Sequence, residues 1–169
     1  MSSDRARLTR RTALSLGGTS LAVAACGFTP IYGEGAAARA LTGRIDVDQI
    51  DGKMGFAARK RLTERLGPAT AATHLLSIRL DVTTDALAIS QTNQISRYNL
   101  TGVARYAVRH LGSDTTVETG SARAFAAYSA SASPFATRVA EEDARERLAI
   151  TLADQIVTRI AATSESWFQ

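Results

Sequence analysis

Apolar and polar residues alternate along residues 76–83. A period of two residues is typical of a β-strand that buries one face and exposes the other. The same alternation runs through residues 97–109 and returns in residues 116–128, and the turn-forming sequence at 110–114 separates these two segments. Because such short connections favour antiparallel neighbours, the pattern predicts a meander of three antiparallel strands.

The last part of the chain follows a helical period instead. Ser133 and Pro134 are typical of a helix N-cap and first turn. Beyond them an apolar residue recurs at every fourth position, as Ala140, Ala144, Leu148, Leu152, Ile156 and Ile160. The spacing predicts a long helix that buries this stripe.

Two shorter elements precede the meander. Residues 45–48 alternate and predict a first strand, while residues 55–66 have a helical composition that ends at Gly67 and Pro68. The order β-α-β-β-β-α predicts an α+β fold, in which two helices cover one face of a four-stranded, mostly antiparallel sheet. The pattern does not place the first strand in the sheet.

The first 25 residues are expected to be an export signal outside this fold. Four arginines precede an apolar run over residues 13–25, which is shorter than the roughly 20 residues of a membrane-spanning helix. The pair Arg10 and Arg11 is similar to a twin-arginine signal, although Ala13 stands where that signal has a bulky residue. Both the Sec and the Tat export routes stay open.

Cys26 follows the apolar run in the sequence LAVAAC, which resembles the lipobox of bacterial lipoproteins. It is the chain's only cysteine. We therefore expect Cys26 to carry a covalent lipid and expect no other cofactor. The alternative is a free thiol that follows an ordinary signal peptide.

Cleavage before Cys26 changes the charge of the protein. It removes four arginines and one aspartate, so the formal net charge falls from +4 to +1 and gives no indication of nucleic-acid binding. The expected division is a signal peptide at 1–25, a lipidated tether at 26–42, one α+β domain at 43–163 and a tail at 164–169.

The residues that usually carry catalysis are scarce. His74 and His110 flank predicted strands, and we interpret them as turn or edge residues rather than ligands. Asp46, Asp48 and Asp51 lack the rest of a calcium-loop pattern, so surface carboxylates are favoured. Neither an enzyme nor a metal site is expected.

Several segments resemble the lipopolysaccharide-assembly lipoprotein family LptE, in particular its alphaproteobacterial members. Residues 26–33 (CGFTPIYG) look like that family's mature N-terminus. Residues 133–137 (SPFAT) after Tyr128, then residues 140–144 (AEEDA) and 155–160 (QIVTRI), resemble its last helix. The resemblance covers the mature chain and is weak between residues 40 and 75.

The resemblance implies a protein without enzymatic activity, anchored at the periplasmic face of the outer membrane. It implies that the protein plugs the LptD β-barrel, helps that barrel assemble and assists insertion of lipopolysaccharide into the outer leaflet. The implied partners are the barrel, lipopolysaccharide and the inner leaflet, with no nucleic acid. Two alternatives stay open, namely a lipoprotein subunit of an ABC-type lipid-transport system and a lipid-anchored periplasmic enzyme.

Strand parity assigns five arginines to the polar face of the sheet, opposed mainly by Asp81. They are Arg79, Arg97, Arg105, Arg109 and Arg123. Guanidinium groups bind phosphates through forked hydrogen bonds. These residues are therefore candidates for binding lipid A phosphates or acidic groups of the barrel lumen, and the alternative is an ordinary solvated face.

Overall fold

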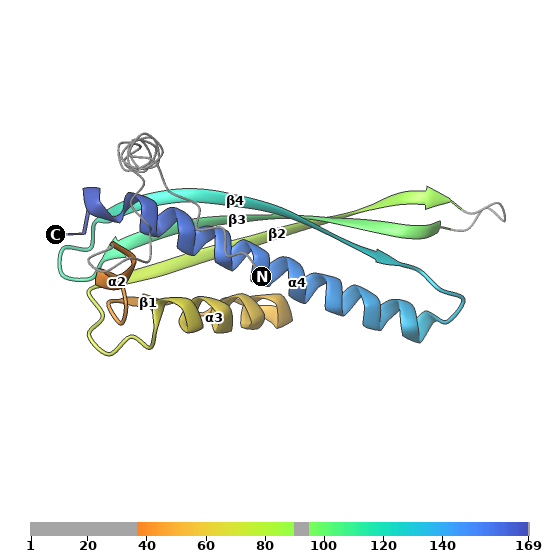
Figure 1. Cartoon of the computed structure of the whole chain (residues 1–169), viewed down its shortest axis with the longest axis horizontal. Helices are drawn as coiled ribbons and strands as arrows, with labels where there is room; N and C mark the ends of the chain where they lie inside the picture. Colours follow the sequence, from red (N-terminus) through yellow and green to blue (C-terminus); the bar gives the residue numbers. More distant parts are fainter. Residues whose placement is uncertain (1–36, 90–94, 169) are drawn as a thin grey trace, which may run out of the picture.

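The computed structural model describes residues 37–89 and 95–168 (Figure 1). The main elements are β1 (Ile45–Val47), α3 (Gly52–Leu66), β2 (His74–Ile89), β3 (Ile95–His110), β4 (Thr116–Ser129) and α4 (Pro134–Thr163). Two short turns, α2 (Ala37–Ala40) and the 3-10 helix η1 (Ser164–Ser166), lie at the ends of the described chain. The predicted order β-α-β-β-β-α is confirmed.

The four strands form one sheet in the order β1-β2-β3-β4. β2, β3 and β4 pair antiparallel, as the alternating pattern predicts. β1 pairs parallel with the start of β2, where Ile45 lies opposite His74, and α3 forms the crossover between them. This contact settles the position of the first strand, which the sequence pattern left open.

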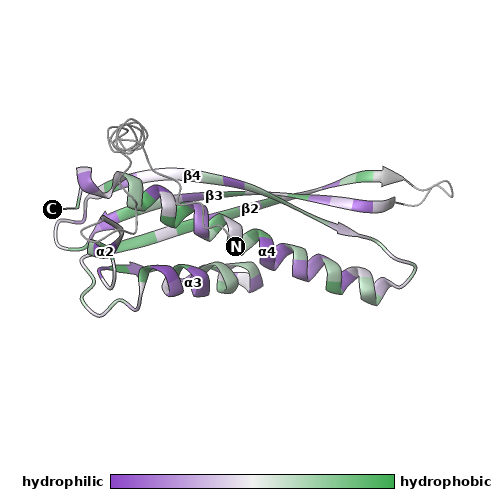
Figure 2. Cartoon of the chain, in the orientation of Figure 1, coloured by the Kyte–Doolittle hydropathy of each residue, from purple (hydrophilic) through white to green (hydrophobic). Residues whose placement is uncertain are grey.

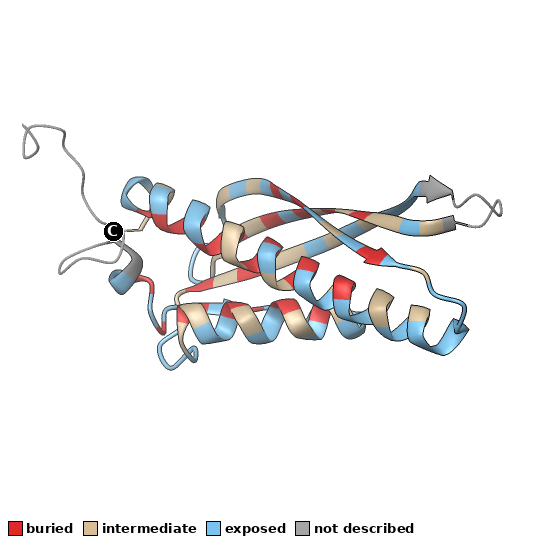
Figure 3. Ribbon diagram, turned by 45° about the vertical axis from the view of Figure 1, so that its right-hand side comes forward, coloured by how far each residue is buried: buried red, intermediate tan, exposed pale blue. Residues whose placement is uncertain are grey.

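The helices lie on one side of the sheet, and the core fills the space between these layers (Figure 3). α4 packs along β3 and β4, while α3 packs beside α4. The stripe on α4 is buried as predicted from Ala144 to Ile160, and Ala140 at its start is half-buried. The Ser133 hydroxyl accepts a hydrogen bond from the Ala136 amide, which confirms the N-cap.

Gly102 on β3 shows how closely α4 approaches the sheet. A Cβ atom at this position would lie 3.0 Å from side-chain atoms of both Leu148 and Leu152. A glycine here lets the two leucines rest directly on the strand backbone. Hydrophilic and hydrophobic residues alternate along the strands and around both helices, as this layering requires (Figure 2).

α3 buries a narrower face than its apolar residues suggest. Ala58, Leu62 and Leu66 recur at every fourth position and are buried, whereas Phe56 is 73% exposed. Two residues correspond to about 200° around a helix, so Phe56 points away from the face that carries Ala58. Gly67 ends the helix with a φ of +78°, a backbone conformation suited to glycine.

The domain extends past both ends of the segment 43–163. Within the expected tether, Ala37–Ala40 are helical and Leu41 is 1% exposed in the core. Within the expected tail, the Phe168 amide bonds to the Ser164 carbonyl at 2.7 Å, and Trp167 and Phe168 pack on the core. These apolar side chains gain free energy by leaving water, so the chain folds back over the core. Residues 1–36, with the predicted signal, lie outside the described residues.

Candidate functional site

The face of the sheet turned away from the helices is the candidate site, and we call it the open face. Even-numbered residues of β2 up to Ala86, of β3 and of most of β4 face the helices, as buried Leu76, Leu100 and Ala122 show. Side chains alternate between the faces of a strand, so odd-numbered residues point to the open face. All five arginines are odd-numbered, and the structure confirms the predicted parity.

The strand register brings three of the five arginines together. Arg79 on β2 lies directly opposite Arg105 on β3. Arg105 lies opposite Ser121 on β4, so Arg123 is its diagonal neighbour, about 7–8 Å away along the sheet. We call Arg79, Arg105 and Arg123 the central arginine cluster. Arg97 and Arg109 are not part of it, because they lie near opposite ends of β3, about 40 Å apart.

Carboxylates compensate two of the five arginines. Arg105 Nη1 lies 2.5 Å from Asp81 Oδ2, and both side chains are more than half exposed. Arg109 pairs with Asp114 in the turn before β4. The sequence predicted Asp81 as an acidic neighbour of the arginines, but it did not predict Asp114.

The other three arginines leave the open face cationic. Within residues 37–89 and 95–168, no carboxylate lies within ion-pair distance of Arg79, Arg97 or Arg123. Two like charges directly opposite each other destabilise a sheet, and in the pair Arg79 and Arg105 only Arg105 has a carboxylate partner. A bound anion would relieve that repulsion.

The central cluster is bordered by small and apolar side chains. A shallow depression over Arg79 and Arg105 is also lined by Ser77 and Ala107. Phe125 on β4 is 64% exposed and lies two residues beyond Arg123 on the same face. Cations beside an exposed ring suit a ligand that combines phosphates with apolar groups. Phe125 was not predicted from the sequence as part of this site, although its parity places it on the same face as Arg123.

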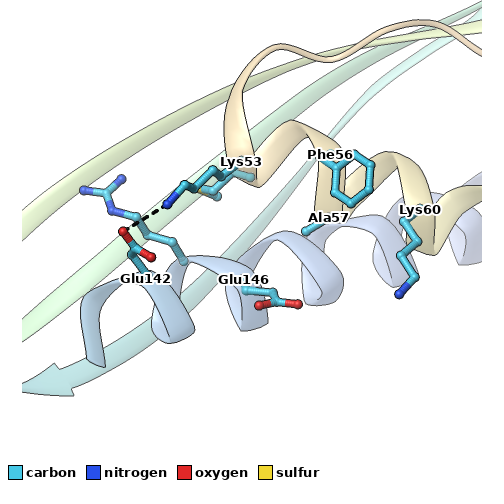
Figure 4. Close-up of a pocket in the computed structure, with 8 residues that line it drawn as sticks. Lys53, Phe56, Ala57, Lys60, Glu142 and Glu146 are labelled. Carbon is cyan, nitrogen blue, oxygen red and sulfur yellow. Dashed lines mark hydrogen bonds and ion pairs between the residues drawn. The ribbon is translucent and has the colours of Figure 1, made fainter. Parts of the chain in front are cut away.

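A second concave surface lies between the helices, on the other side of the sheet from the open-face arginines. This groove of about 410 Å³ is lined by residues of α3 and α4, among them Met54, Phe56 and Lys60 (Figure 4). Lys53 and Glu142 form an ion pair of 3.1 Å across it. The lining carries three cations, Lys53, Lys60 and Arg145, and two carboxylates, Glu142 and Glu146. Its small net charge gives little basis for selecting a charged ligand.

The described residues contain no cluster of three or more His, Cys, Asp or Glu side chains able to hold a metal ion. Asp48 instead accepts hydrogen bonds from the Gln49 amide and the Ser77 hydroxyl. His74 and His110 flank strands as predicted, but the register places them opposite each other, and His74 is only 4% exposed.

No helix in the described part of the chain is long and apolar enough to cross a membrane. Cys26 lies outside the described residues.

Solved structures from other bacteria share this fold. A protein of Caulobacter crescentus described as a candidate lipoprotein is 18% identical, with a TM-score of 0.63 over 77% of this chain and 96% of its own. The rare lipoprotein B of Shewanella oneidensis is 16% identical, with a TM-score of 0.55 over 73% and 96%. A minor lipoprotein of Acinetobacter baumannii is 12% identical, with a TM-score of 0.53 over 71% and 90%. At these identities the likeness shows the fold alone.

The sequence itself matches one family. No curated protein sequence matches the chain significantly. The profile of the family LptE, described as lipopolysaccharide-assembly, matches residues 32–160, which include every main strand and helix up to Ile160. The chain therefore belongs to the LptE family of lipopolysaccharide-assembly lipoproteins.

Proposed function

We propose that this protein is a non-enzymatic outer-membrane lipoprotein that plugs the lumen of an LptD β-barrel, helps the barrel assemble and assists lipopolysaccharide insertion into the outer leaflet. Membership of the LptE family supports the assembly role. The main support for the plug role is that three long strands present a polar, cationic face that no described element covers. A sheet with one solvated face suits a water-filled lumen.

The shape of the domain supports an anchor at one end. α2, which lies within the expected tether, contacts η1, and the C-terminus lies at the same end of the sheet (Figure 1). β2 and β3 each run for 16 residues, roughly 50 Å, to the far end. A lipid on Cys26 would therefore hold one end near the inner leaflet while the β2–β3 hairpin reaches away from it.

The anchor has its own test. Replacing Cys26 by Ser removes the thiol that would be acylated, so the protein should stay uncleaved or be released from membranes. Intact-mass analysis of the unsubstituted protein should show a diacylglyceryl group and an acyl chain on the N-terminal cysteine. An unmodified mature N-terminus would exclude the anchor.

The open face supplies the proposed contact with lipopolysaccharide or with the barrel. Arg79 and Arg123 have no carboxylate partner among the described residues, and Phe125 offers an apolar surface beside them. Lipid A phosphates and acidic lumen residues both suit guanidinium groups. An ordinary solvated face would instead tolerate loss of these charges without any change in binding.

Affinity purification from solubilised membranes tests the plug role. The tagged protein should retain an LptD barrel in near-equal amount after a high-salt wash, because a plug buries a large interface. Recovery of a transporter ATPase and permease would favour the ABC-type alternative. Absence of any barrel protein from membranes that contain LptD would contradict the proposal.

A further inference from the structure

The end of the domain that carries the C-terminus is closed by a short aromatic segment. We call Ser164–Phe168 the C-terminal clasp. Its two aromatic rings lie against His74 at the start of β2, with centroid distances of 5.3 Å to both Trp167 and Phe168. The His110 ring at the end of β3 completes the enclosure, 5.0 Å from His74. The buried His74 ring therefore packs directly beneath the clasp.

Hydrogen bonds hold the clasp in this position. The Trp167 and Phe168 amides both donate to the Ser164 carbonyl, and the buried Ser164 hydroxyl donates to the Ala161 carbonyl. Trp167 Nε1 donates to Thr163 Oγ1 at 3.3 Å. All these bonds are local, so packing on His74, on α2 and on the end of α4 holds the clasp against the rest of the domain. Chain ends with few long-range bonds open at low free-energy cost.

The hydrogen bonds of His74 indicate which ring nitrogen carries the proton. Nδ1 lies 2.9 Å from Thr73 Oγ1, and that hydroxyl lies 3.4 Å from the Arg44 carbonyl, which can only accept. The ring proton is assigned to Nδ1, which can donate to Thr73 Oγ1, because an N–H on Nε2 would be buried without an acceptor. Nε2 is then the unprotonated nitrogen of a neutral imidazole. It is buried and has no hydrogen-bond partner among the described residues.

We propose that the C-terminal clasp is an acid-sensitive latch, in which protonation of His74 at Nε2 releases Trp167 and Phe168 from the end of the domain. A second N–H on the ring would lie in an aromatic enclosure without an acceptor, which costs free energy as long as the clasp is closed. Opening the clasp gives that N–H to water. The proposal is independent of the function proposed above.

The charges around the enclosure do not offset a positive His74. Burial lowers the pKa of His74 below its ordinary value of 6.5, and the neighbouring His110 lowers it further. No other group contributes to this shift, although the surrounding elements also carry charged residues, namely Arg39, Arg44, Asp46, Arg109 and Glu165. Because the open state binds the proton more readily, closure is most stable above pH 6.5 and weakens as the pH falls below it.

Release would act on the point where the N-terminal segment joins the domain. η1 contacts α2, and both contact the end of α4. Leu41, directly after α2, is buried in the same end of the core. An open clasp would therefore remove part of the packing that fixes α2. The latch would make the packing at this end of the domain depend on pH.

Trp167 reports on the latch directly, because it is the chain's only tryptophan. Acrylamide quenching of the full chain should increase roughly twofold between about pH 8 and about pH 5, with a midpoint below the ordinary histidine value. Far-UV circular dichroism should stay constant over the same range, since the latch opens without unfolding the sheet. The midpoint should coincide with the titration of His74 followed by NMR of its imidazole protons.

Histidine variants assign the transition to one ring. His74→Asn keeps a polar group near Thr73 but cannot titrate, so quenching should stay low at both pH values. His74→Phe tests the same point with an apolar ring. His110→Asn should keep the transition and move its midpoint upward, because it removes the neighbour that lowers the pKa of His74. The latch is refuted if His74→Asn and His74→Phe titrate like the original protein, if acid lowers quenching, or if the quenching midpoint differs from the His74 titration.

Discussion

The two faces of the sheet share the same three strands but are under different physical constraints. On the covered face, the close approach of α4 sets the size of side chains, so Gly102 lies beneath Leu148 and Leu152. On the open face, size is unconstrained and charge dominates, with Arg79 directly opposite Arg105. A change on the covered face should therefore alter stability, and a change on the open face should alter binding.

The largest effect is expected where α4 fills the covered face. Leu148→Ala or Ile156→Ala should lower the free energy of unfolding by about 2–5 kcal/mol, because each leaves a cavity beneath the sheet. Thr158→Ala, on the exposed side of α4, should change it by less than about 0.5 kcal/mol. Urea titration measures both. An unchanged midpoint for Leu148→Ala would remove the distinction between the faces.

Adding a side chain on the covered face tests the same size limit by overfilling the core instead of leaving a cavity. A Cβ at Gly120 on β4 would lie 2.5 Å from the hydroxyl oxygen of Tyr106, so the ring must move. Gly120→Ala should therefore destabilise the protein by about 1–3 kcal/mol in the same titration. Ser121→Ala, one residue further and on the open face, is the matched control and should stay within about 0.5 kcal/mol. Equal effects at the two positions would contradict the size constraint.

A smaller effect is expected where polar groups join the two helices. Arg61 and Arg65 of α3 both bond to Asp154 of α4, at 2.9 and 2.7 Å. Asp154→Asn should cost about 1 kcal/mol, since water screens side chains that remain about one-third exposed. Glu146→Gln, elsewhere on α4, should have almost no effect on the urea midpoint. A loss as large as that of Leu148→Ala would show that charge also governs the covered side.

Much of this architecture can be predicted from the sequence, because the spacing of apolar residues and the alternation of strand faces depend only on neighbouring residues. The alternation in residues 76–83 and the stripe from Ala144 to Ile160 predict both faces of the sheet and the buried face of α4. Ser133 and Gly67 mark helix ends for equally local reasons.

Contacts between distant segments could not be predicted in the same way. That Arg79 lies opposite Arg105, and His74 opposite His110, depends on the register of the β2–β3 hairpin. Even the pairing of Arg109 with Asp114, five residues apart, depends on the geometry of the turn before β4, where Asp114 adopts a φ of +57°. Burial of Leu41 and Trp167 depends on how the chain ends fold over a finished core.

The open face is expected to bind ligands while the covered face stabilises the fold, and one double variant tests both expectations. Arg79→Glu with Arg123→Glu should weaken binding to lipopolysaccharide or to the LptD barrel about tenfold or more, because charge-assisted bonds are lost. Its free energy of unfolding should fall by no more than about 0.5 kcal/mol, because both side chains are exposed. Lys60→Glu with Arg138→Glu changes the net charge equally on the helix side and should bind normally. A folded Arg79→Glu, Arg123→Glu protein that binds both ligands as tightly as the original would contradict the claim.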